Sequence, residues 1–245
     1  MSINGIFIAH KASAPMESLD SADLIANQGI DGDRYCKKEG TYSVLRVSQK
    51  QPGECEPGRQ LTMISKDSII EAFKRNELSC DNVSTQMVGN LRRNIVVEGI
   101  SAQELIDAIG HVIEIGTNGV KIFVQRHCVP CMYNERKNGI PGMMEAIWKE
   151  AGVSCQILSS GKISIKDSVT ILPFSLETKD LLFDPGNHEP GYYIPPSKRT
   201  AAMVKGALQE KKDMKAILLK IDPDGIQRSK DSYASVGLKM WPDHV

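Results

Sequence analysis

The chain has 245 residues, of which 41% are hydrophobic and 5% aromatic, and its 30 Lys and Arg equal its 30 Asp and Glu. A chain of this length can bury the core of one large domain, or of a domain with an appendage. The balanced charge gives no argument for binding nucleic acid or an acidic membrane surface. No run of about 18 apolar residues is present, so no membrane-spanning helix is expected.

The cysteines and the N-terminus indicate the compartment. Only Cys128 and Cys131 lie close together in the sequence, and the other four cysteines are scattered, at positions 36, 55, 80 and 155. The N-terminus lacks the basic stretch and following apolar stretch of a secretory signal. Together these features predict reduced thiols and a cytoplasmic location.

Up to Pro173 the chain is dominated by short strand patterns. Strands are predicted over 3–9, 42–47, 60–64, 94–97, 111–115, 120–124, 156–159 and 163–172. The two strands that flank 116–119 are expected to pair as a hairpin. Segment 51–58 is expected to be a loop.

Three helices interrupt these strands. They are predicted over 65–76, 101–110 and 143–151. Ser65 is expected to cap the first, residues 101–104 have the capping-box pattern for the second, and Gly152 is expected to end the third. Strands with a few inserted helices predict a mainly β (α+β) fold, a closed or nearly closed barrel over residues 1–173.

After Pro173 the short strand patterns end, and turn residues and then a basic stretch follow. Segment 174–197 is rich in turn residues and predicts a linker or a strap over the barrel. The extension 198–245 is expected to be partly helical, with a helix that begins near Ser197. Segment 216–221, before 222–225, either continues this helix or forms a strand. Its stretch 198–220 holds seven Lys and Arg against two acids, which indicates either a solvated basic face or a docking surface for an acidic redox partner.

Two segments carry residues suited to chemistry. The first is 29–35, where two glycines around Asp31 allow a tight turn that a ligand can approach closely. Asp33 and Arg34 in this turn can pair with each other in a surface salt bridge or with groups of a ligand.

The second segment is 124–131, at the end of a predicted strand. Pro130 has no amide hydrogen for a ladder bond, so the strand should stop there and Cys131 should lie in a loop just beyond it. Arg126 and His127 place positive or protonatable groups beside the thiols. That setting favours the thiolate, the form that binds metals and attacks electrophiles.

Three kinds of thiol site are compatible with Cys128 and Cys131. A structural zinc site needs four ligands, and no second close pair of cysteines is present. A thioredoxin-like dithiol needs a following helix in an α/β frame, whereas segment 132–142 contains one Pro and two Gly and the frame is rich in strands. In the third kind, one thiolate binds a soft metal brought by a cofactor, or carries sulfur. Cys128 is otherwise a core cysteine without chemistry.

The order of five segments resembles one family. The segments are Gly29–Tyr35, Arg59–Ile64, Arg92–Gly99, Ile113–Gly116 and Cys128–Cys131. In this order they resemble the MOSC domain, the C-terminal domain of molybdenum cofactor sulfurases, over about residues 3–173. The resemblance implies a MOSC-type β-barrel that holds molybdenum cofactor (molybdopterin) or carries sulfur for it.

The resemblance also implies roles for single residues. In amidoxime-reducing relatives the cysteine at the position of Cys131 binds molybdenum, and the arginine at the position of Arg92 contacts the cofactor. A thiolate sulfur is a good ligand for a soft metal, and the guanidinium group of arginine can bind a phosphate with two parallel hydrogen bonds. The expected cofactor-binding residues are Arg34, Arg59, Gln60, Arg92, Arg93 and Asn94, and the expected proton donors are His127 and Asp33.

The chain departs from the family pattern in several places, and some of these departures argue against particular functions of the family. The chain has no aminotransferase-like domain with a Schiff-base lysine, which argues against pyridoxal phosphate and a complete sulfurase. It has no ferredoxin-like cysteine cluster either. Val129 replaces a serine of some relatives, and Lys166 stands where relatives usually have glycine in the final turn.

Two functions follow from this resemblance. The first is an oxidoreductase that reduces N-hydroxylated bases or amidoximes, with Cys131 as the metal ligand and an external flavin or iron–sulfur protein as electron donor. The second is a non-catalytic carrier of molybdenum cofactor, or of persulfide sulfur on Cys131. Neither function involves nucleic acid or a membrane.

Overall fold

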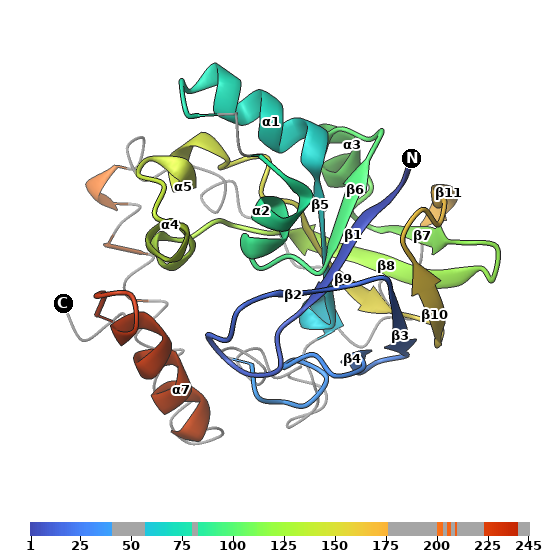
Figure 1. The fold of residues 1–245 in the computed structure, drawn as a ribbon, viewed down its shortest axis with the longest axis horizontal. Coiled ribbons are helices and arrows are strands. Elements are labelled where there is room, and N and C mark those ends of the chain that lie inside the picture. The colour runs from blue at the N-terminus through green and yellow to red at the C-terminus, as the bar shows by residue number, and fades with distance from the viewer. Residues whose placement is uncertain are drawn as a thin grey trace.

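The computed structural model describes residues 1–40, 57–79, 83–175, 200–202, 205–206, 209 and 223–239. Its central feature is a curled β-sheet, a half-barrel with several helices on it (Figure 1). The prediction of a mainly β fold with inserted helices is confirmed. The predicted strand 42–47, most of the linker 174–197 and most of the basic stretch 198–220 lie outside the described residues, so the division into domains stays a prediction.

The main sheet has eight strands in the order β11-β7-β8-β9-β5-β6-β1-β2. Their bounds are Ser2–Ile8 (β1), Glu17–Leu19 (β2), Leu61–Ser65 (β5), Ile95–Glu98 (β6), His111–Ile115 (β7), Val120–His127 (β8), Val153–Ile157 (β9) and Val169–Ser175 (β11). Within this sheet β5 and β6 pair in parallel and the other neighbours are antiparallel, including the predicted hairpin of β7 and β8.

A second sheet has the order β10-β3-β4, with bounds Gly161–Ser164, Ser21–Ile25 and Gly29–Ile30. Its buried residues, such as Leu24, Ile30 and Ile163, belong to the same hydrophobic cluster as those inside the main sheet. The two sheets therefore enclose one core.

Main-chain bonds draw the far strands of the curled sheet together. The Ile3 amide donates to the Asp167 carbonyl at 2.9 Å, and the Lys166 amide donates to the Ile3 carbonyl at 2.8 Å. Lys166 lies in the left-handed region with φ of 73°, which costs a non-glycine residue about 1–2 kcal/mol. The expectation of an unusual turn at Lys166 is confirmed, and this turn splits the predicted strand 163–172 into β10 and β11.

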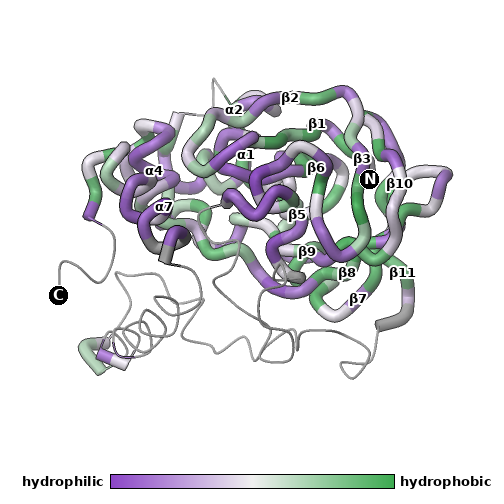
Figure 2. Tube along the Cα trace, turned by 90° about the horizontal axis from the view of Figure 1, so that it is seen from below, coloured by the Kyte–Doolittle hydropathy of each residue, from purple (hydrophilic) through white to green (hydrophobic). Residues whose placement is uncertain are grey.

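Alternating side chains supply two hydrophobic cores. In β1, Ile6 points into the half-barrel and Phe7 into the second core, as the two-residue period of a strand requires. The second core lies under α1 (Lys66–Arg75), α2 (Thr85–Asn90) and α5 (Met143–Ala146). Figure 2 shows hydrophobic stretches along β1, β7 and β11, whereas α4 (Met132–Asn138) is largely hydrophilic.

Both predicted N-terminal helix caps are present. The Ser65 side chain accepts from the Ser68 amide at the start of α1. In α3 (Ala102–Asp107), Ser101 and Glu104 form both bonds of the capping box. Capping depends on a few adjacent residues, which is why the sequence predicts it correctly.

The predicted helix 143–151 is too long, because only Met143–Ala146 is helical. The chain must then turn to bring Gly152 against β5: a Cβ there would lie 2.1 Å from the Met63 carbonyl oxygen, and φ is +85°. The sequence also misses β2, β3, β4, α2 and α4. In the extension that was expected to be partly helical, α7 (Pro223–Ala234) begins at Pro223, because a proline in the first turn of a helix loses no hydrogen bond.

Candidate functional site

Cys131 lies between a strand and a helix. β8 ends at His127, and Cys131 is the residue immediately before α4. The prediction that the strand stops before Cys131 is confirmed, but the expectation of a loop without a following helix is wrong. The helix is short enough to end before Pro141, at Gly139, whose φ of 65° is the left-handed conformation typical of a helix end.

The two cysteines of the motif have different surroundings. Cys128 is buried, its sulfur lies 3.1 Å from the Ser154 hydroxyl, and its amide donates to the Gly152 carbonyl. Cys131 is only half-buried. Cys128 therefore belongs to the packing between β8 and β9, and Cys131 is the more exposed of the two residues.

The charges around Cys131 come from two arginines distant in sequence. Burial raises the pKa of the Cys131 thiol, while the amides of Asn134 and Tyr133 and the guanidinium groups of Arg93 and Arg92 act in the opposite direction. Burial prevails, so the free thiol is protonated at neutral pH. Metal binding would release that proton.

Arg126 and His127, the neighbours expected to activate the thiol, make other contacts. The Arg126 guanidinium donates to the Gly58 carbonyl at 3.4 Å. The Nε2 atom of His127 lies 3.1 Å from the Lys149 carbonyl, so Nε2 is the nitrogen that donates. His127 is 4% exposed, and its proposed role as proton donor stays a prediction that would require this bond to break.

Arg92 occupies a strained backbone position between α2 and β6. Its φ is 64°, in the left-handed region, and one guanidinium nitrogen donates to the Ala14 carbonyl at 2.8 Å. Burial, and then the positive charge of Arg34, lower the pKa of Arg92 to about 10. A strained, partly desolvated cation of this kind is typical of functional sites rather than of surface arginines.

Arg93 is buried and is held by two main-chain carbonyls. Its Nε donates to Ala151 at 2.7 Å and its Nη1 to Leu91 at 3.1 Å. Within the described residues, neither Arg92 nor Arg93 forms an ion pair with a carboxylate. Buried positive charge without a carboxylate partner is costly unless a bound anion compensates it.

Asp33 and Arg34 pair with each other, but in the interior rather than on the surface. Asp33 is 1% exposed, and its carboxylate lies 3.2 Å from the Arg34 guanidinium. The carboxylate also accepts from the amides of Ala9 and Tyr35, and the Arg34 guanidinium lies 4.6 Å from the centre of the Tyr35 ring. Asp33 thus orients Arg34, and its proposed proton transfer stays a prediction.

Asn94 joins this turn to the sheet. Its side-chain oxygen accepts from the Thr62 amide and hydroxyl at 3.1 and 2.9 Å. Its amide nitrogen donates to the Phe7 carbonyl at 3.0 Å and lies 3.4 Å from the Asp33 carboxylate. With both ends of its side chain engaged, Asn94 positions Asp33, and through it Arg34, and its expected cofactor contact stays a prediction.

Gln60 and Arg59 lie along the barrel wall. Arg59 ends a short 3₁₀ helix, Pro57–Arg59. Gln60 is 1% exposed, and its side-chain oxygen accepts from the Ile157 amide at 2.8 Å, where β9 pairs with Ile122 of β8. Ile122 is five residues before the end of β8, so Gln60 supports the sheet at a distance from Cys131. Cofactor contacts by Gln60 and Arg59 stay predictions.

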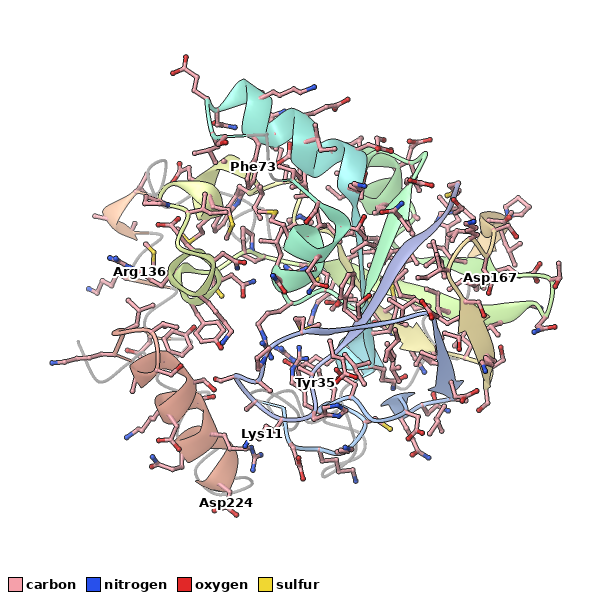
Figure 3. The ribbon with its side chains drawn as sticks, in the orientation of Figure 1. Lys11, Tyr35, Phe73, Arg136, Asp167 and Asp224 are labelled. Carbon is pink, nitrogen blue, oxygen red and sulfur yellow. The ribbon has the colours of Figure 1, made fainter. Side chains whose placement is uncertain are left out.

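Sequence reasoning missed Tyr133, which connects α4 to the tail. Tyr133 is buried, its hydroxyl donates to the Ser13 hydroxyl at 3.2 Å, and its ring centroid lies 5.7 Å from that of Tyr233 in α7. Figures 1 and 2 both place α7 beside α4, and Figure 3 shows side chains of the two helices meeting. Nothing in the sequence around Tyr233 signals this contact.

Asn134 was also missed. Asn134 is 6% exposed, its Nδ2 donates to the Leu91 carbonyl at 2.9 Å, and its Oδ1 has no hydrogen-bond partner in the part of the chain that the structure describes. A buried acceptor without a partner costs about 1–3 kcal/mol. Cys131, Arg92, Arg93, Arg34, Tyr133 and Asn134 are called the Cys131 cluster below.

The family of the chain follows from a direct comparison. Residues 50–170 match the family model of the MOSC domain. The chain is a MOSC-domain protein. The YuaD protein from Bacillus subtilis shares the fold, with a TM-score of 0.53 at 16% sequence identity over 69% of this chain and 93% of that one.

A second solved structure is less similar to this MOSC protein. YiiM from Escherichia coli gives a TM-score of 0.49 at 13% identity over 72% of each chain, a similarity too low to argue from. No match was found among curated protein sequences. The MOSC fold is therefore established, and the reaction must be argued from the Cys131 cluster.

The Cys131 cluster of this MOSC protein fits molybdenum cofactor. In the part of the chain that the structure describes, no three His, Cys, Asp or Glu side chains gather as a metal site, so a metal here would need most of its ligands from a cofactor. Cys131 offers one sulfur ligand, Arg92 and Arg93 offer cations for a phosphate, and the Asn134 oxygen offers an acceptor for a ring N–H.

Across the described residues, no helix has the length and apolarity to span a bilayer.

Proposed function

We propose that this MOSC protein binds molybdenum cofactor through Cys131, Arg92 and Arg93, and reduces N-hydroxylated bases or amidoximes. The observation that carries the proposal is a half-buried thiol beside two guanidinium groups that have no carboxylate partner among the described residues. A soft metal with an anionic, phosphate-bearing cofactor satisfies both features at once.

The protein residues would hold and orient the bound group. Arg93 is fixed by two main-chain carbonyls, so its remaining donors can serve a phosphate without reorganisation. Arg34, oriented by Asp33, adds positive charge beside Arg92. The Cys131 thiol would lose its proton on binding the metal, and the nearby arginines would stabilise the resulting thiolate.

The reaction requires electrons and protons from elsewhere. An N-hydroxy compound, two electrons and two protons give the parent amine and one water. When bound, the cofactor supplies the two-electron redox chemistry for N–O cleavage. The electrons would come from an external flavin or iron–sulfur protein, and His127 or solvent would supply protons.

A half-buried cysteine beside two arginines motivates a second candidate function, sulfur carriage. After losing its proton to solvent, the Cys131 thiolate would attack the outer sulfur of a donor persulfide, which leaves the donor as a thiol and Cys131 as a persulfide. A persulfide is more acidic than a thiol, so Arg92 and Arg93 would stabilise its anion. In this function the protein turns over no N-hydroxylated substrate.

Two cysteine variants and one assay test the proposed function. Protein purified from a host that makes the cofactor is analysed for molybdenum and pterin, and a chemical reductant then drives the reduction of an N-hydroxylated purine. Cys131→Ser should lose the metal, whereas Cys128→Ser, the matched control, should keep most of it. Equal loss in both variants would indicate a dithiol site. A wild-type protein without turnover, and with Cys131 heavier by one sulfur atom, would establish the carrier function instead.

A further inference from the structure

We propose that the side-chain oxygen of Asn134 is a ligand-binding group, which accepts a hydrogen bond from a ring N–H of the heterocycle held in the Cys131 cluster. The inference rests on the proposed function and deepens it by assigning a residue that recognises the ring rather than the phosphate or the metal. Its basis is a buried oxygen that lacks a partner beside the candidate metal ligand.

The orientation of the Asn134 amide is determined by its neighbour. The Leu91 carbonyl can only accept, so the side-chain atom 2.9 Å from it must be the nitrogen. The oxygen therefore points away from Leu91, and among the described residues it finds no donor. Because Asn134 is 6% exposed, bulk solvent contributes little to satisfying it, so its donor is an ordered water or a ligand that displaces that water.

Asn134 stands between the thiol and Arg93. Its main-chain amide donates to the Cys131 carbonyl at 2.9 Å. The Leu91 carbonyl that holds its side chain also accepts from the Arg93 guanidinium at 3.1 Å. One carbonyl thus fixes the side chains of both Arg93 and Asn134, and the Arg93 charge and the Asn134 main-chain amide both act on the Cys131 thiol.

This arrangement specifies the chemistry of the ligand. Arg92 and Arg93 require an anionic group, whereas the Asn134 oxygen requires an uncharged donor. A nitrogen heterocycle that bears ring or exocyclic N–H groups meets the second requirement. The N–H can belong to the pterin of the cofactor or to the base of the substrate, and the two sources are separable by experiment.

Asn138 provides a matched control on the same helix. Its side-chain nitrogen also donates to main-chain carbonyls, to Asn134 at 2.8 Å and to Asn90 at 3.4 Å, and it is half-buried. Its oxygen is not among the buried acceptors that lack a partner. Asn138→Leu therefore removes the same kind of amide–carbonyl bond but no orphaned oxygen.

The test titrates the apo-protein with three probes: inorganic phosphate, a phosphate ester of a 2-amino-4-oxopteridine, and N6-hydroxyadenine. Asn134→Leu should weaken binding of the pteridine ester about tenfold, the loss expected for one hydrogen bond, and leave phosphate affinity unchanged. Asn138→Leu should leave all three affinities unchanged. If only N6-hydroxyadenine binds more weakly to Asn134→Leu, the N–H belongs to the substrate, which also supports the inference.

Other outcomes overturn the inference. Unchanged affinity for both heterocycles in Asn134→Leu would show that the oxygen binds neither ring. Equal loss of phosphate affinity would show that Asn134 acts only by positioning Arg93 through Leu91. If Asn134→Leu does not fold, Asn134→Ala takes its place in each titration.

The proposed function can fail separately. Wild-type protein that binds phosphate and N6-hydroxyadenine but no pteridine ester would refute cofactor binding. Weaker binding of N6-hydroxyadenine to Asn134→Leu would still support the role of Asn134 in that case, and unchanged binding would refute it.

Discussion

The Cys131 thiol should react slowly with alkylating reagents at neutral pH, although it is accessible. Burial raises its pKa above the ordinary value of 9.0, so less than about 1% is thiolate at pH 7. The alkylation rate of Cys131 in apo-protein should therefore rise about tenfold per pH unit from pH 7 to 9, without a plateau. Iodoacetamide labelling followed by peptide mass spectrometry measures this rate for Cys131 alone.

The effect of the arginines on the pKa of Cys131 provides a second test of this prediction. The Arg93 guanidinium favours the thiolate, so Arg93→Gln should raise the pKa of Cys131 further and slow alkylation at each pH. Arg126→Gln, the control, should leave the profile unchanged, because Arg126 contacts Gly58 instead. A plateau below pH 9 in the wild type would refute the argument, as would a larger effect of Arg126→Gln than of Arg93→Gln.

Three further predictions concern stability, cofactor retention and the electron donor. Gly152→Ala should lower the free energy of unfolding in urea by roughly 3 kcal/mol or more, because its φ is +85° and its Cβ would lie 2.1 Å from a carbonyl oxygen of β5; a loss below about 1 kcal/mol would contradict this. Arg92→Gly should leave the unfolding free energy of the apo-protein within about 1 kcal/mol of wild type, since the glycine relieves the left-handed strain at φ of 64°. The same variant should nevertheless retain less molybdenum, and an unfolded protein would show that Arg92 is structural. Charge reversal at Lys211, Lys212 and Lys215 should slow turnover driven by an acidic electron-donor protein, and the effect should depend on salt. Turnover driven by a small reducing dye should stay unchanged. Equal effects on both would show that this stretch is not the docking surface for the donor.

The local elements follow from the sequence because a few adjacent residues determine each of them. Ser65 and the pair Ser101–Glu104 start their helices with side-chain bonds to amides three residues away. The alternation in 111–115 and 120–124 is sufficient for a hairpin. The order of the five family segments indicates the MOSC fold, which the match over 50–170 confirms.

Helix and strand lengths depended on contacts that the sequence does not show. The 143–151 pattern is helical, but the helix ends at Ala146 because Gly152 must approach β5 closely. α4 forms despite the nearby glycines because Gly139 ends it after two turns. Intrinsic propensity competes here with packing, and packing prevails.

The composition of the candidate site was decided by the tertiary structure. In the sequence Cys131 has Arg126 and His127 as its nearest bases, but those side chains contact Gly58 and Lys149. The fold instead brings the arginines that follow α2 to the thiol, and the Leu91 carbonyl that holds Arg93 also holds the side chain of Asn134. The sequence by itself determined the fold and identified Cys131 and its two arginines through family resemblance. Only the structure decided which charges act on the thiol, because Coulomb interactions and burial depend on distances between segments that lie far apart in the chain.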